Sequence, residues 1–202
     1  EEKLIRQNAV DRTLAVLKDF KKIIDDMAVD EVRAIATAAL RSAKNSELFT
    51  VPASEIGIEF EIISGEREAY YDYMGVVNTL PVSDCMIVDI GGASTELIYV
   101  KDGKNTEMVS IPMAAVNITE KYFSGTVADD KELDFAVEQF ADRLREVDWL
   151  KNVSDVNIVG IGGTIRALAK MQNIADEEVH GFTMSKELTF DKIYELVKMP
   201  IE

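Results

Sequence analysis

The chain has 202 residues, a formal net charge of −15 at pH 7, one cysteine and one histidine. These numbers exclude an internal disulfide and a histidine-rich metal cluster, fit a reduced cytoplasmic setting, and argue against nucleic acid, whose phosphates are bound mainly through Lys and Arg. No apolar stretch approaches the ~20 residues of a membrane-spanning helix, so neither a membrane nor a nucleic acid is expected as a partner.

The first 80 residues are predicted to alternate between helices and short apolar strands. The expected elements are a helix at 4–28, a strand at 32–37, a helix at 39–49, a strand at 59–63 and a helix at 66–78. The first helix carries apolar residues at helical spacing from Val10 to Met27. Strand, helix and strand form a βαβ unit, which implies that the two strands are parallel. Ser64 is a suitable N-cap for the helix that follows.

The rest of the chain follows an order typical of a ribonuclease-H-like domain. The expected elements are strands at 85–90, 95–101 and 106–111, helices at 112–123 and 131–148, a strand at 156–161, and helices at 165–171 and 190–198. The pair Asp102-Gly103 predicts a hairpin, so the three strands should form an antiparallel meander. The helix at 131–148 is expected to bury Val137 and Phe140, and the strand at 156–161 reads as buried.

This order predicts an α/β protein of the ribonuclease-H-like class. Residues 1–65 are interpreted as the later part of one such domain, because no opening meander precedes them. Residues 66–202 are interpreted as a second, largely complete domain.

The stretch IVDIGGASTELIYV at 87–100 places two glycines between two apolar strands. Gly91 and Gly92 allow the backbone to approach a ligand closely and to adopt positive φ. Successive amides in such a turn can surround phosphate oxygens, and Ser94 and Thr95 add hydroxyl donors. The turn therefore suits a phosphate site, although a plain glycine-rich hairpin would show the same residues.

Two acidic residues flank this turn, and a second glycine turn lies further along the chain. Asp89 would repel a bare phosphate but could hold Mg²⁺ or its water, and Glu96 follows on the next strand. Gly162, Gly163 and Thr164 stand between a strand and a helix, where a helix N-terminus attracts anions. The simpler interpretations are Asp as a turn former and glycine as a packing residue.

Charged residues on two helices complete the candidate set. Glu66 and Glu68 open the helix at 66–78, where a carboxylate could accept a proton from an attacking water. Acidic residues in a first turn also simply stabilise the helix dipole. Arg41 is suited to clamp phosphate through two hydrogen bonds, and it equally suits a solvated helix position.

Four segments, in this order, resemble the exopolyphosphatase and guanosine pentaphosphate phosphohydrolase family. They are IATAALRSAKN, FEIISGEREA, IVDIGGASTELIYV and IVGIGGTIRALAK, and the resemblance covers nearly the whole chain. The family belongs to the superfamily of acetate kinases, sugar kinases, Hsp70 and actin. The resemblance implies two ribonuclease-H-like domains, with the substrate between them, and Mg²⁺-dependent hydrolysis of a terminal phosphoanhydride.

The resemblance also implies a role for each candidate residue. Glu68, rather than Glu66, falls on the position of the general base. Asp89 and Glu96 match the acidic residues that position Mg²⁺ and water. The implied phosphate contacts are Gly91, Gly92, Ser94, Thr95, Arg41, Gly162, Gly163 and Thr164.

The implied activity is release of orthophosphate from the end of inorganic polyphosphate. The alternatives are hydrolysis of guanosine pentaphosphate, and a module that binds polyphosphate or the alarmone without turnover. A kinase of the same superfamily is less favoured, because the SGxxEA element favours water as the nucleophile. The sequence leaves the oligomeric state open, with a homodimer among the options.

The chain departs from the family pattern in two respects. Ala93 stands where the family often has Gly, which requires a φ that a Cβ tolerates. The family's opening meander, with its D-x-G-S-N-S motif, and its later helices have no match here. We therefore expect an incomplete fragment with little or no catalytic activity of its own.

Overall fold

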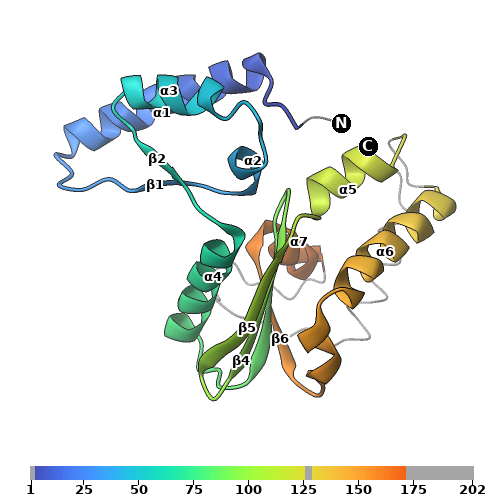
Figure 1. Ribbon diagram of the computed structural model, residues 1–202. Helices are drawn as coiled ribbons and strands as arrows, with labels where there is room; N and C mark the ends of the chain where they lie inside the picture. The colour runs from blue at the N-terminus through green and yellow to red at the C-terminus, as the bar shows by residue number, and fades with distance from the viewer. Residues whose placement is uncertain (1–2, 126–128, 172–202) are drawn as a thin grey trace. The chain divides into compact units, whose positions relative to one another are not determined.

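The computed structural model describes residues 3–125 and 129–171, so the helix expected at 190–198 lies outside the described residues. The chain divides into two compact units, residues 1–67 and 68–202, and each is described by itself (Figure 1). The boundary expected between residues 65 and 66 from the sequence stays a prediction.

The first unit combines three helices with one pair of strands. Its elements are α1 (Gln7–Asp26), β1 (Ala34–Ala36), α2 (Ala38–Arg41), α3 (Glu47–Glu55) and β2 (Phe60–Ile62). The strands are parallel, which confirms the predicted βαβ unit. Val10 and Leu17 of α1 pack with Phe49 and Ala53 of α3. Met27 is 71% exposed, so the buried face of α1 ends before the predicted stripe does.

The single helix predicted at 39–49 is wrong, because the chain leaves helical geometry between α2 and α3. The side chain of Asn45 accepts a hydrogen bond from the amide of Ile5 at 2.7 Å and donates one to its carbonyl at 3.0 Å. The amide of Lys44 donates to the carbonyl of Lys3 at 3.0 Å. These contacts hold the intervening turn against the start of the chain in place of helical hydrogen bonds.

The second unit is a four-stranded sheet with helices on both faces. Its elements are α4 (Gly65–Thr79), β3 (Cys85–Ile90), β4 (Thr95–Lys101), β5 (Lys104–Ile111), α5 (Ala115–Tyr122), α6 (Asp130–Arg145), a 3₁₀ helix η1 (Asp148–Asn152), β6 (Asn157–Ile161) and α7 (Gly162–Met171). The strand order is β5-β4-β3-β6, with β6 parallel to β3. The antiparallel meander is confirmed, and Asp102 and Gly103 turn the hairpin with φ of 52° and 71°.

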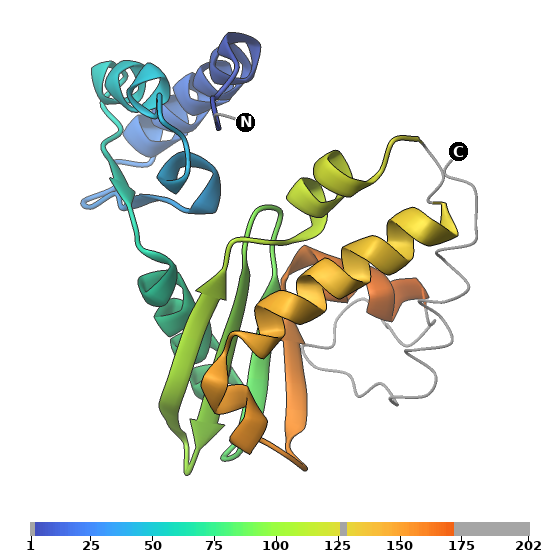
Figure 2. The ribbon, with the colours of Figure 1, turned by 45° about the vertical axis from the view of Figure 1, so that its right-hand side comes forward.

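Alternate residues of the central strands pack against different helices. Cys85 and Ile87 of β3 pack with Ala69 and Val76 of α4, whereas Met86 packs on the opposite face. Figure 1 and Figure 2 show α4 on one side of the sheet and α6 on the other. The side chains that face α4 therefore form separate rows from those that face α6.

Helix α6 begins with a capping box and buries a slightly different face from the predicted one. Asp129 accepts a hydrogen bond from the amide of Lys131 at 2.7 Å, as the sequence pattern of a helix start suggests. Ala136 is buried beside Phe140, whereas Val137 is 60% exposed, so the prediction for Val137 is wrong. Ala136 and Val137 are adjacent in the sequence, and the spacing of the neighbouring apolar residues fits either of them.

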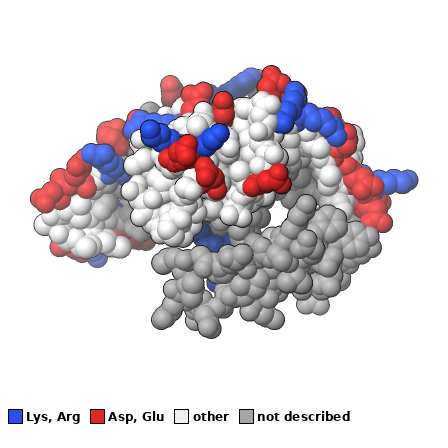
Figure 3. All heavy atoms as spheres, turned by 90° about the horizontal axis from the view of Figure 1, so that it is seen from below, with Lys and Arg blue, Asp and Glu red and all other residues white. Residues whose placement is uncertain are grey.

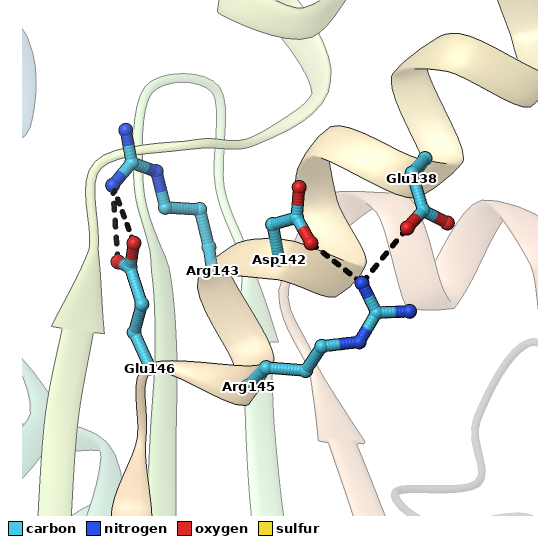
Figure 4. Close-up of polar contacts among 5 residues, drawn as sticks. All are labelled: Glu138, Asp142, Arg143, Arg145 and Glu146. Atoms are coloured by element: carbon cyan, nitrogen blue, oxygen red, sulfur yellow. Dashed lines mark hydrogen bonds and ion pairs between the residues drawn. The ribbon is translucent and has the colours of Figure 1, made fainter.

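Two arginines near the end of α6 form ion pairs at the surface. Arg145 contacts Glu138 at 2.8 Å and Asp142 at 2.5 Å, and Arg143 contacts Glu146 at 3.0 Å (Figure 4). All five side chains are more than half exposed, so each pair contributes little to stability. Figure 3 shows acidic and basic side chains interspersed on the face that it draws.

Strand β6 is one of the two edge strands of the described sheet, and the prediction of a buried strand is wrong for its first half. Ile158 is 72% exposed, whereas Val159 and Ile161 pack against the core beneath α4. An edge strand lacks a neighbour on one side, which leaves part of its apolar surface open. Within the described part of the chain, no helix combines the length and apolar character that crossing a bilayer requires.

Candidate phosphate and metal site

Asp89 and Glu96 are direct cross-strand partners at the end of the hairpin formed by β3 and β4. Paired residues of antiparallel strands place their side chains on the same face, here the face that packs on α4. Candidate ligand oxygens of these two residues and of Asp72 all lie within 4.8 Å of one another. The pairing brings both predicted metal ligands to one point, together with a carboxylate that the sequence analysis did not single out.

Helix α4 supplies two of the carboxylates at this point. Asp72 lies between Ala69 and Val76 on the face of α4 that packs on the sheet. Glu68 precedes Asp72 by one helical turn and is half-buried. Burial is the main cause that raises the pKa values of Asp72, Asp89 and Glu96, and the charge of Glu68 acts in the same direction on all three. The predicted general base therefore lies within electrostatic reach of the predicted metal ligands.

The cluster of carboxylates is electrostatically unfavourable in the absence of a cation. Burial, followed by the charges of Asp89, Glu96 and Glu68, raises the pKa of Asp72 to about 7. Burial also raises the pKa of Asp89, which the positive charge of Arg166 partly opposes. A cation bound among these oxygens would favour their charged forms.

The buried carboxylates differ in how well their oxygens are satisfied. Glu96 is 1% exposed, and its pKa is raised mainly by burial. The hydroxyl of Ser110 donates to Glu96 Oε1 at 2.7 Å, and the hydroxyl of Ser94 donates to the same carboxylate. By contrast, Asp72 Oδ2 is buried and has no hydrogen-bond partner in the described structure. Such an orphaned oxygen is costly unless a ligand satisfies it.

In the glycine turn between β3 and β4, the carbonyls accept hydrogen bonds, whereas three of the amides donate to no acceptor in the described structure. The carbonyls of Gly91 and Gly92 accept hydrogen bonds from the first amides of α5 at 2.9–3.3 Å. The side chain of Asn117 donates to the carbonyl of Ala93 at 2.8 Å. The amides of Gly92, Ala93 and Ser94 have no acceptor among residues 3–125 and 129–171. The loop is thus held through its acceptors, which leaves three consecutive donors for an anion.

The reason for the two glycines differs from the expected one. Neither Gly91 nor Gly92 has a positive φ, so the expectation that these glycines adopt one is wrong, whereas the close approach of a ligand stays a prediction. A Cβ at Gly91 would lie 3.1 Å from the carbonyl oxygen of Ser94, and one at Gly92 would lie 3.3 Å from Val116 Cγ2. Close packing therefore favours glycine here. Ala93 has no positive φ either, so its Cβ is tolerated.

The second glycine turn lies directly beside the first. Gly162, Gly163 and Thr164 form the first turn of α7, whereas the sequence placed them before the helix. Thr164 Oγ1 donates to the carbonyl of Ile90 at 3.1 Å. A Cβ at Gly162 would lie 2.3 Å from Asp89 Oδ1. The parallel pairing of β3 and β6 thus brings the first turn of α7 to the predicted metal ligand.

Four predicted phosphate contacts have other partners in the structure: Ser94 and Thr164, whose hydroxyls are described above, and Thr95 and Arg41. Thr95 is 1% exposed, and its hydroxyl donates to the carbonyl of Met113 at 2.8 Å. The proton that Thr95 was expected to offer a phosphate is therefore already used in the core. Arg41 lies in the first unit, where its Nη1 donates to the carbonyl of Ile63 at 3.0 Å.

Two residues of this site were not predicted from the sequence. Asp72 could have been found, because a carboxylate three residues after Ala69 and four before Val76 interrupts an apolar helix face. Asn117 carries no such signal, because its contact with Ala93 spans 24 residues and follows only from the packing of α5 on the loop.

The chain is similar to known proteins in both its sequence and its structure. The sequence model of the Ppx/GppA phosphatase family matches residues 1–202. A guanosine-5'-triphosphate,3'-diphosphate pyrophosphatase of Pseudoalteromonas atlantica is 32% identical over 185 residues, which cover 86% of this chain and 36% of that protein. The chain therefore spans little more than a third of the length of that relative.

Two solved structures are similar over nearly the whole chain. The PPX-GPPA enzyme of Aquifex aeolicus is 33% identical, with a TM-score of 0.75, over 98% of this chain and 67% of that one. An exopolyphosphatase of Cytophaga hutchinsonii is 26% identical, with a TM-score of 0.88, over 98% of this chain and 66% of that one. These likenesses confirm the predicted α/β fold class.

Proposed function

The chain belongs to the Ppx/GppA phosphatase family, and on that premise we propose that its second unit carries the phosphate and metal site of a Mg²⁺-dependent phosphohydrolase. The enzyme removes the terminal orthophosphate from a chain of phosphoanhydrides. Inorganic polyphosphate is the first proposed substrate, and guanosine pentaphosphate is the second.

One observation carries this proposal above the others. In the described structure, the loop after β3 holds three amides without acceptors, at Gly92, Ala93 and Ser94, and carboxylates flank the loop at Asp89 and Glu96. Amide donors alone would suit any small anion, whereas carboxylates alone would repel one. Their combination suits an anion that arrives with a divalent cation, as a phosphate chain does.

The residues present fit a magnesium ion. Asp72 Oδ2 is buried without a hydrogen-bond partner in the described structure, and Gly162 leaves open the space beside Asp89 Oδ1. The candidate ligands are carboxylate oxygens, which hard divalent cations prefer. Asp89 and Glu96 would hold the ion, which would neutralise negative charge on the phosphate oxygens.

The chain's own groups account for the remaining steps. The amides of Gly92, Ala93 and Ser94 bind oxygens of the terminal phosphoryl group, and the first turn of α7 offers further amides to the same substrate. Glu68 accepts a proton from the attacking water. The water oxygen bonds to the terminal phosphorus as the bridging bond breaks, so the shortened chain leaves with the bonding electrons.

The two candidate substrates have different support among the relatives. The Cytophaga hutchinsonii exopolyphosphatase supports polyphosphate at 26% identity. The Pseudoalteromonas atlantica pyrophosphatase supports the guanosine nucleotide at 32% identity. Both substrates end in the same phosphoanhydride group, so the site proposed here serves either one.

Phosphate release tests the proposal. It is measured with both substrates and Mg²⁺ for this chain, and for a chimera in which the Aquifex aeolicus relative carries residues 1–202 in place of its own matching segment. The chimera is expected to release phosphate. Glu68→Gln should lower that rate by a factor of about 10² to 10⁴ without weakening substrate binding.

Glu66→Gln is the matched control, because it makes the same change at an exposed position of the same helix. It should retain the rate of the unaltered chimera. A Glu68→Gln chimera as active as the control would contradict the role of Glu68. Substrate binding without phosphate release by the unaltered chimera would support a binding module in place of an enzyme.

A further inference from the structure

Asp72 occupies a position where an ordinary helix would carry an apolar side chain. It lies on the face of α4 whose neighbours Ala69 and Val76 are buried against the sheet. A carboxylate at such a position is unfavourable unless it is paired or bound to a cation. In the described structure, the charged groups that act on Asp72 are Glu68, Asp89 and Glu96, and all three are acidic.

Hydrogen-bond donors or a positive charge offset the charges of Glu96 and Asp89, whereas Asp72 has no such group beside it in the described structure. Two hydroxyls donate to Glu96, and the positive charge of Arg166 acts on Asp89. Asp72 Oδ2 is buried without a partner in the part of the chain that the structure describes. The cluster therefore has one oxygen that a ligand is needed to satisfy.

The spacing of the oxygens matches the shell of a single cation. The candidate ligand atoms of Asp72, Asp89 and Glu96 all lie within 4.8 Å of one another. Two oxygens bound to one Mg²⁺ are separated by roughly 3 to 4 Å, since each Mg–O bond is about 2.1 Å long. A small contraction, or one intervening water, would bring all three carboxylates onto one ion.

We propose that Asp72 is a third carboxylate ligand of the divalent cation, bound directly or through one water, and that it anchors the cation to α4. This proposal rests on the function proposed above, because it assigns a further residue to the same site. Since Asp72 and Glu68 lie one turn apart on α4, the cation would also fix that helix, and with it the general base, against the hairpin.

A competing interpretation is that Asp72 is a neutral acid that merely fills space beneath the sheet. Under that interpretation, Asp72→Asn preserves the shape of the side chain and relieves repulsion within the cluster. It would then leave cation binding unchanged or tighten it. As a ligand, Asp72 supplies charge and an oxygen to the ion, so the same substitution must weaken binding.

Binding of Mn²⁺, as a spectroscopic substitute for Mg²⁺, separates these interpretations without an activity assay. Mn²⁺ affinity is measured by electron paramagnetic resonance for the chain, Asp72→Asn, Asp89→Asn and Asp134→Asn. The last variant makes the same change at an exposed position of α6 and serves as the matched control. Circular dichroism checks that each variant is folded.

We expect Asp72→Asn to weaken Mn²⁺ binding about tenfold or more, as Asp89→Asn does, while Asp134→Asn retains the original affinity. If Asp72→Asn binds Mn²⁺ as tightly as the control while Asp89→Asn does not, the role of Asp72 is overturned and the proposed metal site stands. If the unaltered chain binds no Mn²⁺, the proposed metal site fails and the role of Asp72 fails with it.

Discussion

The Oδ1 atom of Asp89 lies 2.3 Å from the point where a Cβ at residue 162 would stand, so Gly162 leaves the space that this carboxylate occupies. Asp89 lies at the end of β3, and Gly162 directly follows β6, the strand that pairs in parallel with β3. The two glycine-containing segments therefore depend on each other, because the absence of a side chain at Gly162 leaves room for the carboxylate of Asp89.

Gly162→Ala should therefore disturb both the fold and the metal site. The residue has a φ of +85°, where a side chain costs about 1 to 3 kcal/mol, and the new methyl group would also displace Asp89. Urea unfolding is expected to show a loss of at least that size, together with weaker Mn²⁺ binding. Gly163→Ala is the control, because within the described residues a Cβ at this position would meet no atom within 4 Å outside its own turn of helix. Equal stability and affinity in the two variants would contradict the account.

Asn117→Ala should loosen the glycine turn between β3 and β4 without removing any proposed phosphate contact. Its side chain donates to the carbonyl of Ala93 at 2.8 Å and accepts from the amide of Ala114 at 2.7 Å. Loss of these hydrogen bonds should destabilise the folded conformation of the loop by about 1 to 3 kcal/mol. We expect weaker binding of tripolyphosphate by calorimetry. Asn78→Ala, at an exposed position of α4, should leave the affinity unchanged, and an equal loss in both variants would argue against a specific role for Asn117.

Substitutions of Thr95 separate a structural role from the predicted phosphate contact. The buried hydroxyl donates to the carbonyl of Met113 at 2.8 Å. Thr95→Val leaves that carbonyl unpaired and should lower the free energy of unfolding by about 1 to 3 kcal/mol, whereas Thr95→Ser retains the donor. Tripolyphosphate affinity should be the same for both folded variants. If Thr95→Val binds tripolyphosphate more weakly than Thr95→Ser while its stability is unchanged, the predicted contact between the Thr95 hydroxyl and phosphate would be supported after all.

The stability of the metal-free chain should depend on pH through Asp72. Its pKa is raised to about 7 in the folded state, mainly by burial, from an ordinary value of 3.8. The folded state thus holds a proton that the unfolded chain releases, and the resulting stability is complete below pH 3.8 and is lost as the pH rises through about 7.

Asp72→Asn removes this contribution, so its urea midpoint should fall less than that of the unaltered chain between about pH 4.5 and about pH 7.5. Both proteins are measured in chelator, so that no cation interferes. Asp89 and Glu96, whose pKa values are also raised, are present in both proteins and affect both curves. Parallel curves for the two proteins would show that Asp72 does not hold the proton.

The hairpin and its carboxylates could be predicted from the sequence because local signals agree there. Asp102-Gly103 marks one turn, and the glycines at 91 and 92 mark the other. The limits of the first two strands, 85–90 and 95–101, were therefore correct, whereas the third strand begins at Lys104 and not at residue 106. With those limits, strand alternation alone puts Asp89 and Glu96 at the ends of two apolar rows. The direct pairing of the two residues follows from the register, which the sequence analysis did not work out.

The features that were missed depend on contacts between distant residues. The break after α2 depends on Asn45 and Ile5, which lie 40 residues apart. The requirement for glycine at 162 depends on Asp89, on another strand. The core role of the Thr95 hydroxyl depends on Met113. Local propensity carries no information on such pairs, so these features required the structure.

The most direct test of the central claim is an amide-resolved titration of the chain by nuclear magnetic resonance with tripolyphosphate, in the presence and absence of Mg²⁺. The account predicts saturable shifts at the amides of Gly92, Ala93 and Ser94 that require Mg²⁺ and disappear in Asp89→Asn. Shifts confined to exposed lysines, or unaffected by either Mg²⁺ or the substitution, would contradict the proposal that this loop and its carboxylates form the phosphate site.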